Sequence, residues 1–313
     1  MLKIGLIDVD GHNYPNLALM KLSAWHKRQG DVVKWYEPLF DGFPKPPLDR
    51  VYMSKVFTFT PDYEFAINAR EVIRGGTGYF YPDGGEELPE EIEHVFPDYE
   101  LYGIKNTVYG FLTRGCPRGC GFCIVGHKEG RASRKVADLE EFWNGQKNIT
   151  LMDPNILACR QHTELLGQLA ESRAYVDLNQ GIDARLLTPE NVALLKKIKI
   201  KEIHFAWDNP KDEKQIVPKL KMFKEMTGIR DREAIVYMLV NFNSSFEEDL
   251  HRVYTIREIG MTPYTMIYEK EKTKKTDPVR RLQSWTNNKI IWFGNPTMKF
   301  EDFDERKKHR KEI

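Results

Sequence analysis

Three cysteines close together are the residues whose spacing most clearly predicts chemistry. Cys116, Cys120 and Cys123 lie in a loop that spans residues 113–123. Three glycines in this loop let the backbone wrap closely round an inorganic core and direct amides toward its sulfides. Three thiolates can bind three irons of a cubane cluster, and the fourth iron then has no protein ligand from this loop. We therefore expect a [4Fe-4S] cluster with one iron open to a small molecule.

The C-x3-C-x2-C spacing, with Phe122 just before the last cysteine, resembles the radical S-adenosylmethionine (SAM) superfamily. The resemblance implies that the open iron chelates the amino and carboxylate groups of SAM. One electron from the cluster would then cleave SAM to methionine and a 5′-deoxyadenosyl radical that abstracts hydrogen from a substrate. It also implies an external electron donor such as flavodoxin or ferredoxin. The substrate, whether small molecule, peptide or nucleic acid, cannot be read from the sequence.

Two other interpretations of these cysteines stay open. One is a structural zinc site with His127 as the fourth ligand, although zinc sites favour C-x2-C pairs and only Cys120 and Cys123 form such a pair. The other is an iron-sulfur protein that transfers electrons without SAM chemistry. We interpret Cys159, the remaining cysteine, as a buried core thiol in preference to a redox or substrate group. No second cluster is therefore expected.

Alternating strand and helix patterns must position this loop. We predict strands at residues 4–9, 31–36, 50–57, 107–112, 149–152, 174–178, 202–206, 234–239 and 263–267. We predict helices at residues 16–28, 136–143, 161–172, 189–198, 211–227, 246–259 and 277–287. Six strand–helix repeats from residue 107 onward favour a partial (β/α)6, TIM-like barrel, in which reactive groups lie at the C-terminal ends of the strands.

The expected fold class is therefore α/β, with three parts. A small Rossmann-like α/β domain and its connector occupy residues 1–105. The radical SAM barrel occupies residues 106–290, with the cysteine loop after its first strand. A charged extension occupies residues 291–313.

The resemblance implies that the strand ends hold SAM. After the second strand, Met-Asp-Pro-Asn replaces the Gly-Gly-Glu-like motif usual in the family, and Asp153 or Asn155 can still accept from the SAM ammonium. After the third strand, Arg185 can grip the SAM carboxylate through two hydrogen bonds. The alternative for Arg185 is a surface ion pair with Asp183.

The last three strands and the cysteine loop supply the remaining expected SAM contacts. Asp208 can hold the ribose hydroxyls, and Asn241 follows the strand that often contacts adenine and ribose in the family. The backbone at Tyr268 can meet the adenine edge, and Phe122 is expected to pack near the adenine. Each contact alone is a weak signal, and their common position at strand ends is what favours them.

Residues 1–105 resemble the cobalamin-binding domain that precedes the barrel in one radical SAM branch. The match is the βα pattern, the pair Gly75-Gly76 and the tripeptide Asp10-Gly11-His12, because an Asp-x-His pattern supplies a cobalt ligand in cobalamin-dependent methyltransferases. Pro15 stands where a glycine is expected, and the segment is short. The resemblance implies either a cobalamin-dependent methyltransferase or a degenerate domain without cobalamin, in which His12 is a loop residue that caps the next helix.

Composition places few limits on function. The 313 residues carry 47 Lys and Arg against 46 Asp and Glu, a balance that neither indicates nor excludes a nucleic-acid partner. Lysines at residues 270–275 could contact phosphates, but the acids among them favour a solvated face. The apolar runs are too short to span a bilayer, and the start resembles no signal peptide. We therefore expect a cytoplasmic protein with no membrane partner.

Overall fold

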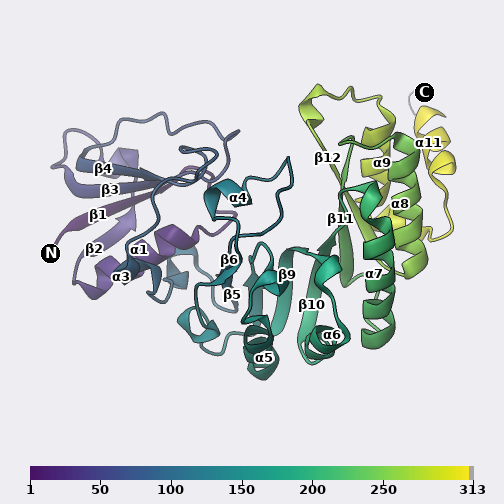
Figure 1. The fold of residues 1–313 in the computed structure, drawn as a ribbon. Coiled ribbons are helices and arrows are strands. Elements are labelled where there is room, and N and C mark those ends of the chain that lie inside the picture. Colours follow the sequence, from purple (N-terminus) through teal and green to yellow (C-terminus); the bar gives the residue numbers. More distant parts are fainter. Residues whose placement is uncertain (310–313) are drawn as a thin grey trace. The chain divides into compact units, whose positions relative to one another are not determined.

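A computed structural model describes residues 1–309 of the chain, which divides into two compact units, Met1–Gln161 and His162–Ile313 (Figure 1). The fold contains a four-stranded sheet of order β2-β1-β3-β4 and a six-stranded sheet of order β12-β11-β10-β9-β8-β5. In both sheets, the strands that pair within one unit are parallel, and helices separate most of them in the sequence. The predicted α/β class is confirmed. The expected boundary at residue 105 falls inside the first compact unit.

The four-stranded sheet opens the chain. Its strands are β1 Lys3–Asp8, β2 Val32–Trp35, β3 Leu48–Ser54 and β4 Ala69–Gly75. Helix α1, Leu17–Arg28, begins where the Asn16 side chain accepts from the Leu19 amide, and its apolar side packs on the sheet through Leu19 and Leu22. The sequence did not predict β4, because this strand carries three charged residues and only two large apolar ones, and it is largely exposed, as suits the edge of a sheet.

The predicted irregular connector is firmly packed within the first unit. It contains the short helix α3, Glu90–Glu93, and the 3-10 turn η1, Tyr99–Tyr102. The buried Tyr99 hydroxyl lies 3.1 Å from the Tyr109 carbonyl oxygen and 3.0 Å from that of Phe142. These contacts join the connector to strand β5, Thr107–Gly110.

Strand β5 leads directly into the frame of the cysteine loop. It pairs in parallel with β8, Asn148–Leu151. Beyond β5, the two-residue strand β6, Thr113–Arg114, pairs antiparallel with β7, Arg134–Lys135. The residues between β6 and β7, which include the four-residue helix α4 Val125–Lys128, therefore form a closed loop.

The helix predicted at residues 136–143 is wrong. That segment holds only the 3-10 turn η2, Leu139–Glu141. Asp138 and Glu141 form a capping box at its start, but the turn ends at Phe142. Ahead of the turn, the Val136 amide donates to the Leu112 carbonyl oxygen at 2.9 Å, so the chain runs extended beside the exit of β5. Because the first residues of the predicted helix are extended and bonded to Leu112, they cannot form a helical turn.

The second unit contains the other four strands of the six-stranded sheet. These are β9 Tyr175–Ile182, β10 Lys199–Ala206, β11 Ala234–Val240 and β12 Thr262–Ile267. Helix α5, His162–Ser172, precedes β9, and the helices that follow the four strands are α6 Pro189–Leu195, α7 Glu213–Thr227, α8 Phe246–Ile259 and α9 Pro278–Thr286. Helices α5 to α9 contact one another in sequence order, and α8 and α9 pack on the last strands (Figure 1). The helices predicted in this unit are confirmed.

The predicted extension at residues 291–313 begins within helix α10, Lys289–Gly294, and continues into α11, Phe300–His309. Its final residues, 310–313, lie outside the described residues. Phe300 and Phe303 are buried, so the extension packs on the second unit as well as carrying charge. Within residues 1–309, no helix combines the length and the apolar character needed to cross a bilayer.

Tyr99 provides a test of the packed connector. Replacing Tyr99 by Phe removes the hydroxyl that bridges two carbonyl groups, and we expect the free energy of unfolding to fall by about 1–2 kcal/mol. Tyr14→Phe is the matched control, since Tyr14 is 71% exposed. Urea unfolding followed by circular dichroism measures both variants. Equal midpoints for the two would contradict the assigned role of Tyr99.

Candidate functional site

The cysteine loop is held in a tight turn at its start. Gly115 has φ of +85°, and a Cβ atom there would lie 2.2 Å from the Ala132 carbonyl oxygen, so only glycine fits. The next amide, that of Cys116, donates to the Gly130 carbonyl oxygen at 3.1 Å. Cys116 is thereby half-buried near the base of the loop, whereas Cys120 and Cys123 are exposed.

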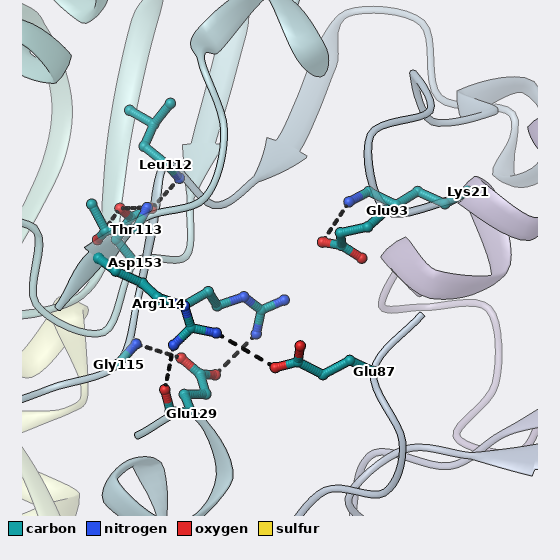
Figure 2. Close-up of polar contacts among 10 residues, drawn as sticks. Lys21, Glu87, Glu93, Leu112, Thr113, Arg114, Gly115, Glu129 and Asp153 are labelled. Atoms are coloured by element: carbon teal, nitrogen blue, oxygen red, sulfur yellow. Dashed lines mark hydrogen bonds and ion pairs between the residues drawn. The ribbon is translucent and has the colours of Figure 1, made fainter. Parts of the chain in front are cut away.

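Glu129 fastens the two ends of the loop together (Figure 2). Its carboxylate accepts from the Arg114 guanidinium at 2.9 Å and from the Gly115 amide at 3.1 Å. Arg134 donates to the Glu129 carbonyl oxygen at 2.7 Å. The Arg114 guanidinium also lies 3.5 Å from the centre of the Phe111 ring. The role of Glu129 was not predicted from the sequence, because it depends on contacts with Arg114 and Gly115 that spacing along the chain does not encode.

Asn155 brings an amide to the sulfur of Cys116. Its Nδ2 donates to Cys116 Sγ at 3.5 Å, and the residue is 2% exposed. The Asn155 carbonyl oxygen accepts from Ser133 Oγ at 3.0 Å, which ties this residue to the far side of the loop. Asn155 Oδ1 is buried without a hydrogen-bond partner among the described residues. The residue expected to contact SAM thus lies beside one of the expected cluster ligands.

Asp153 is committed to the backbone at the exit of β5 (Figure 2). One carboxylate oxygen accepts from the Leu112 amide at 2.9 Å, and the other accepts from the amide and the hydroxyl of Thr113, both at 2.6 Å. Burial raises the pKa of Asp153 to about 7, while the Thr113 and Leu112 hydrogen bonds oppose that shift. The carboxylate expected to accept from the SAM ammonium therefore has both oxygens engaged.

For the donor set of the cysteine loop, the requirement of an iron-sulfur cluster is thiolates on a backbone that can approach closely. Within residues 1–309, one group of His, Cys, Asp and Glu residues brings three ligand atoms within 4.8 Å of one another, and it contains none of the loop cysteines. The glycine turn, the three thiols and the Asn155 amide beside Cys116 fit an iron-sulfur cluster.

Cys159, the fourth cysteine, is buried and lies outside the cysteine loop in the sequence. It follows the 3-10 turn η3, Ile156–Ala158, and is 1% exposed. Its Sγ lies 3.2 Å from Gln161 Oε1. The interpretation of Cys159 as a buried core thiol agrees with this position.

The structure places Arg185 in an ion-pair network of the second unit. Its Nε donates to Asp183 and its Nη1 to Asp212, each at 2.7 Å. The pair with Asp183 that the sequence allowed as an alternative is present, although Asp183 is buried and the pair is not on the surface, and Asp212 extends it. Two edges of the guanidinium are therefore used within the chain.

A buried arginine fixes the ends of β10 and β11. Arg252 is 0% exposed and donates to the carbonyl oxygens of Trp207 at 2.6 Å and Leu239 at 2.9 Å. Its guanidinium also pairs with Asp249. Asp208 accepts from the Leu239 amide at 2.9 Å. Burial raises the pKa of Asp208, and this amide and Arg252 oppose the shift.

Left-handed backbone follows β11 and β12. Asn241, Asn243 and Glu269 have φ of +62°, +52° and +46°, a conformation that costs energy outside glycine and is often found at functional sites. Asn241 Nδ2 donates to the Tyr268 carbonyl oxygen at 3.3 Å. The structure thus brings together two of the predicted SAM contacts, Asn241 and Tyr268. Phe122, in the cysteine loop, is half-buried in the first unit.

His12 has a packing role in the first unit. Its ring stacks on Trp35 with centroids 4.1 Å apart and meets the edge of Tyr102. Asp10 accepts from the amides of Val56 and Phe57 and so holds the loop after β3. Both residues of the expected Asp-x-His motif are therefore engaged in contacts of their own domain.

Comparisons with known proteins leave the family of this chain open. No protein-family model matches the sequence, and no curated protein shows a significant match to it.

Asp153 allows a sharp test of the anchor at β5. In Asp153→Asn, one acceptor oxygen becomes an amide nitrogen that must face a backbone N–H, so a buried donor stays unpaired. We expect the free energy of unfolding to fall by about 2–3 kcal/mol, measured by urea unfolding of cluster-free protein. The control is Asp83→Asn at an exposed position, which should have no effect. Wild-type stability in Asp153→Asn would refute the anchor.

Proposed function

We propose that this protein is a radical SAM enzyme in which Cys116, Cys120 and Cys123 hold a [4Fe-4S] cluster. The observation that carries the proposal is the glycine-bent loop of three thiols with the Asn155 amide at one sulfur. When bound, the cluster would supply the electron that cleaves SAM to methionine and a 5′-deoxyadenosyl radical, which abstracts hydrogen from a substrate. The chain would contribute the three thiolate ligands and leave one iron open to SAM.

The six-stranded sheet supports a finer proposal for the fold. We infer a partial (β/α)6 barrel, because six strands lie in the order of the chain and helices follow β8, β9, β10, β11 and β12. The cysteine loop follows β5, the first of these strands. In such a barrel the C-terminal strand ends form the reactive face.

Several residues at strand ends are proposed to bind SAM. Asn241 and Tyr268, joined by a hydrogen bond, would present the adenine-binding backbone, and Asp208 would accept from the ribose hydroxyls. Arg185 would reach the SAM carboxylate only by releasing Asp212 or Asp183. Asn155 would orient Cys116 through its amide, and its unpaired oxygen could accept from the SAM ammonium.

The proposal includes an external electron donor such as flavodoxin or ferredoxin and a cytoplasmic location. The substrate stays open among small molecules, peptides and nucleic acids. It does not include cobalamin, because the ring of His12 is stacked on Trp35 and Asp10 is bound to the loop after β3.

Anaerobic reconstitution tests the proposed cofactor and reaction together. We expect four irons and four sulfides per chain, and 5′-deoxyadenosine after addition of SAM and dithionite. Serine at position 116, 120 or 123 should abolish the product, because each thiolate holds one iron. Cys159→Ser is the matched control and should retain both cluster and product, since this thiol lies outside the loop.

Two outcomes would favour other functions. An intact cluster that forms no 5′-deoxyadenosine would indicate an iron-sulfur protein without SAM chemistry. A colourless protein with one zinc per chain, lost in the Cys120→Ser variant, would indicate a structural zinc site.

The Asn155 amide has an effect that can be measured without any substrate. A hydrogen bond to a cluster sulfur stabilises the reduced, more negative state and raises the reduction potential. We expect Asn155→Leu to retain the cluster and to lower its potential in an EPR-monitored redox titration. Cys159→Ser should leave the potential unchanged. A higher or unaltered potential in Asn155→Leu would contradict a hydrogen bond to the ligand sulfur.

A further inference from the structure

A group of three potential metal ligands lies on two neighbouring strands of the second unit, apart from the cysteine loop. Asp177 on β9 pairs directly with Glu202 on β10, and His204 is two residues further along β10. Side chains two residues apart on a strand point to the same face. One nitrogen of His204 and one oxygen from each carboxylate lie within 4.8 Å of one another.

This group occupies the face of the sheet opposite to the helices. Ile203, which lies between Glu202 and His204, is fully buried, and Phe205 contacts Phe223 of α7 with ring centroids 4.9 Å apart. The residues that alternate with them therefore point away from α7. The face of the sheet that points away from α7 therefore carries two acids and one imidazole, which are polar groups that need partners.

The ring of His204 is oriented like that of a metal-binding histidine. Its Nδ1 lies 2.9 Å from the Leu178 carbonyl oxygen, which can only accept, so Nδ1 carries a proton. In the neutral imidazole, Nε2 then keeps its lone pair. A backbone carbonyl that fixes one ring nitrogen is the usual companion of a metal bond at the other. Tyr237 stacks on the ring at 4.8 Å and holds its plane.

The carboxylates make only long contacts with the charged groups around them: Glu202 has an ion pair with Lys289, and both acids lie near His204. Asp177 Oδ1 is buried without a hydrogen-bond partner among the described residues, and it lies 3.8 Å from His204 Nδ1. Glu202 lies 3.8 Å from His204 Nε2 and 3.6 Å from Lys289 Nζ, both beyond hydrogen-bond distance. His204 is 6% exposed, so the group combines a buried ring with a buried, unpaired acceptor. A cation held by the imidazole and the two carboxylates would give the buried Asp177 oxygen a partner.

We propose that Asp177, Glu202 and His204 form a binding site for a divalent transition-metal ion, with Zn²⁺ as the best match. One imidazole and two carboxylates are ligands that zinc accepts. Three protein ligands leave a fourth coordination position for water or a small ligand. The site requires no thiolate, so it is independent of the proposed cluster.

Zinc binding to the full-length chain tests the site when the three thiols of the cysteine loop have been removed. The background is the variant with Cys116, Cys120 and Cys123 all changed to serine, because these thiols would bind zinc themselves. Equilibrium dialysis against Zn²⁺ alone should give one bound ion per chain. Glu202→Gln and Asp177→Asn should each weaken binding at least about tenfold, since each removes one ligand.

Three further variants make the test specific. Glu171→Gln changes an exposed acid of α5 and should leave the affinity unchanged. Lys289→Ala removes a nearby cation and should not weaken binding. His204→Gln should weaken zinc binding, and circular dichroism checks that this variant folds. If it does not fold, the affinity of Glu202→Gln for zinc decides the test. No zinc in the triple-serine background, or equal affinity in Glu202→Gln and Glu171→Gln, would overturn the proposal.

Discussion

The structure of the cysteine loop depends on the carboxylate of Asp153. It accepts three hydrogen bonds from Leu112 and Thr113, at the point where β5 ends and β6 begins. Asp153 itself comes just after β8, the neighbouring strand. The Asp153 side chain therefore joins the segment after β8 to the start of the loop that follows β5. Only a carboxylate offers an acceptor to each of these donors.

This anchor determines where the thiols are presented. Beyond it, Glu129 joins the Gly115 amide and Arg114, and the Cys116 amide reaches Gly130, so both ends of the loop are fixed. The same segment after β8 supplies Asn155, whose amide meets the Cys116 sulfur. Asp153 and Asn155, two residues apart, thus have different roles. The backbone is held by Asp153, and the proposed ligand sulfur is held by Asn155.

Local patterns in the sequence predicted most helices and strands, whereas contacts between those elements could not be predicted from it. Helix α9 begins at Asp277 and Pro278, as capping rules predict, but the helix expected at residues 136–143 lost its first residues to pairing with Leu112. The anchoring role of Asp153 depends on the backbone that follows β5, a strand distant from it in the sequence. Asp177 and Glu202 were missed because their proximity follows from strand register, which spacing along the chain does not encode.

The central claim is that SAM binds the open iron of a cluster held by three cysteines. The most direct measurement is the EPR spectrum of the dithionite-reduced, reconstituted protein with and without SAM. We predict a [4Fe-4S]⁺ signal whose g values change when SAM is added, because SAM would become a ligand of one iron. A cluster signal that SAM leaves unaltered, or reduced protein without such a signal, would contradict it.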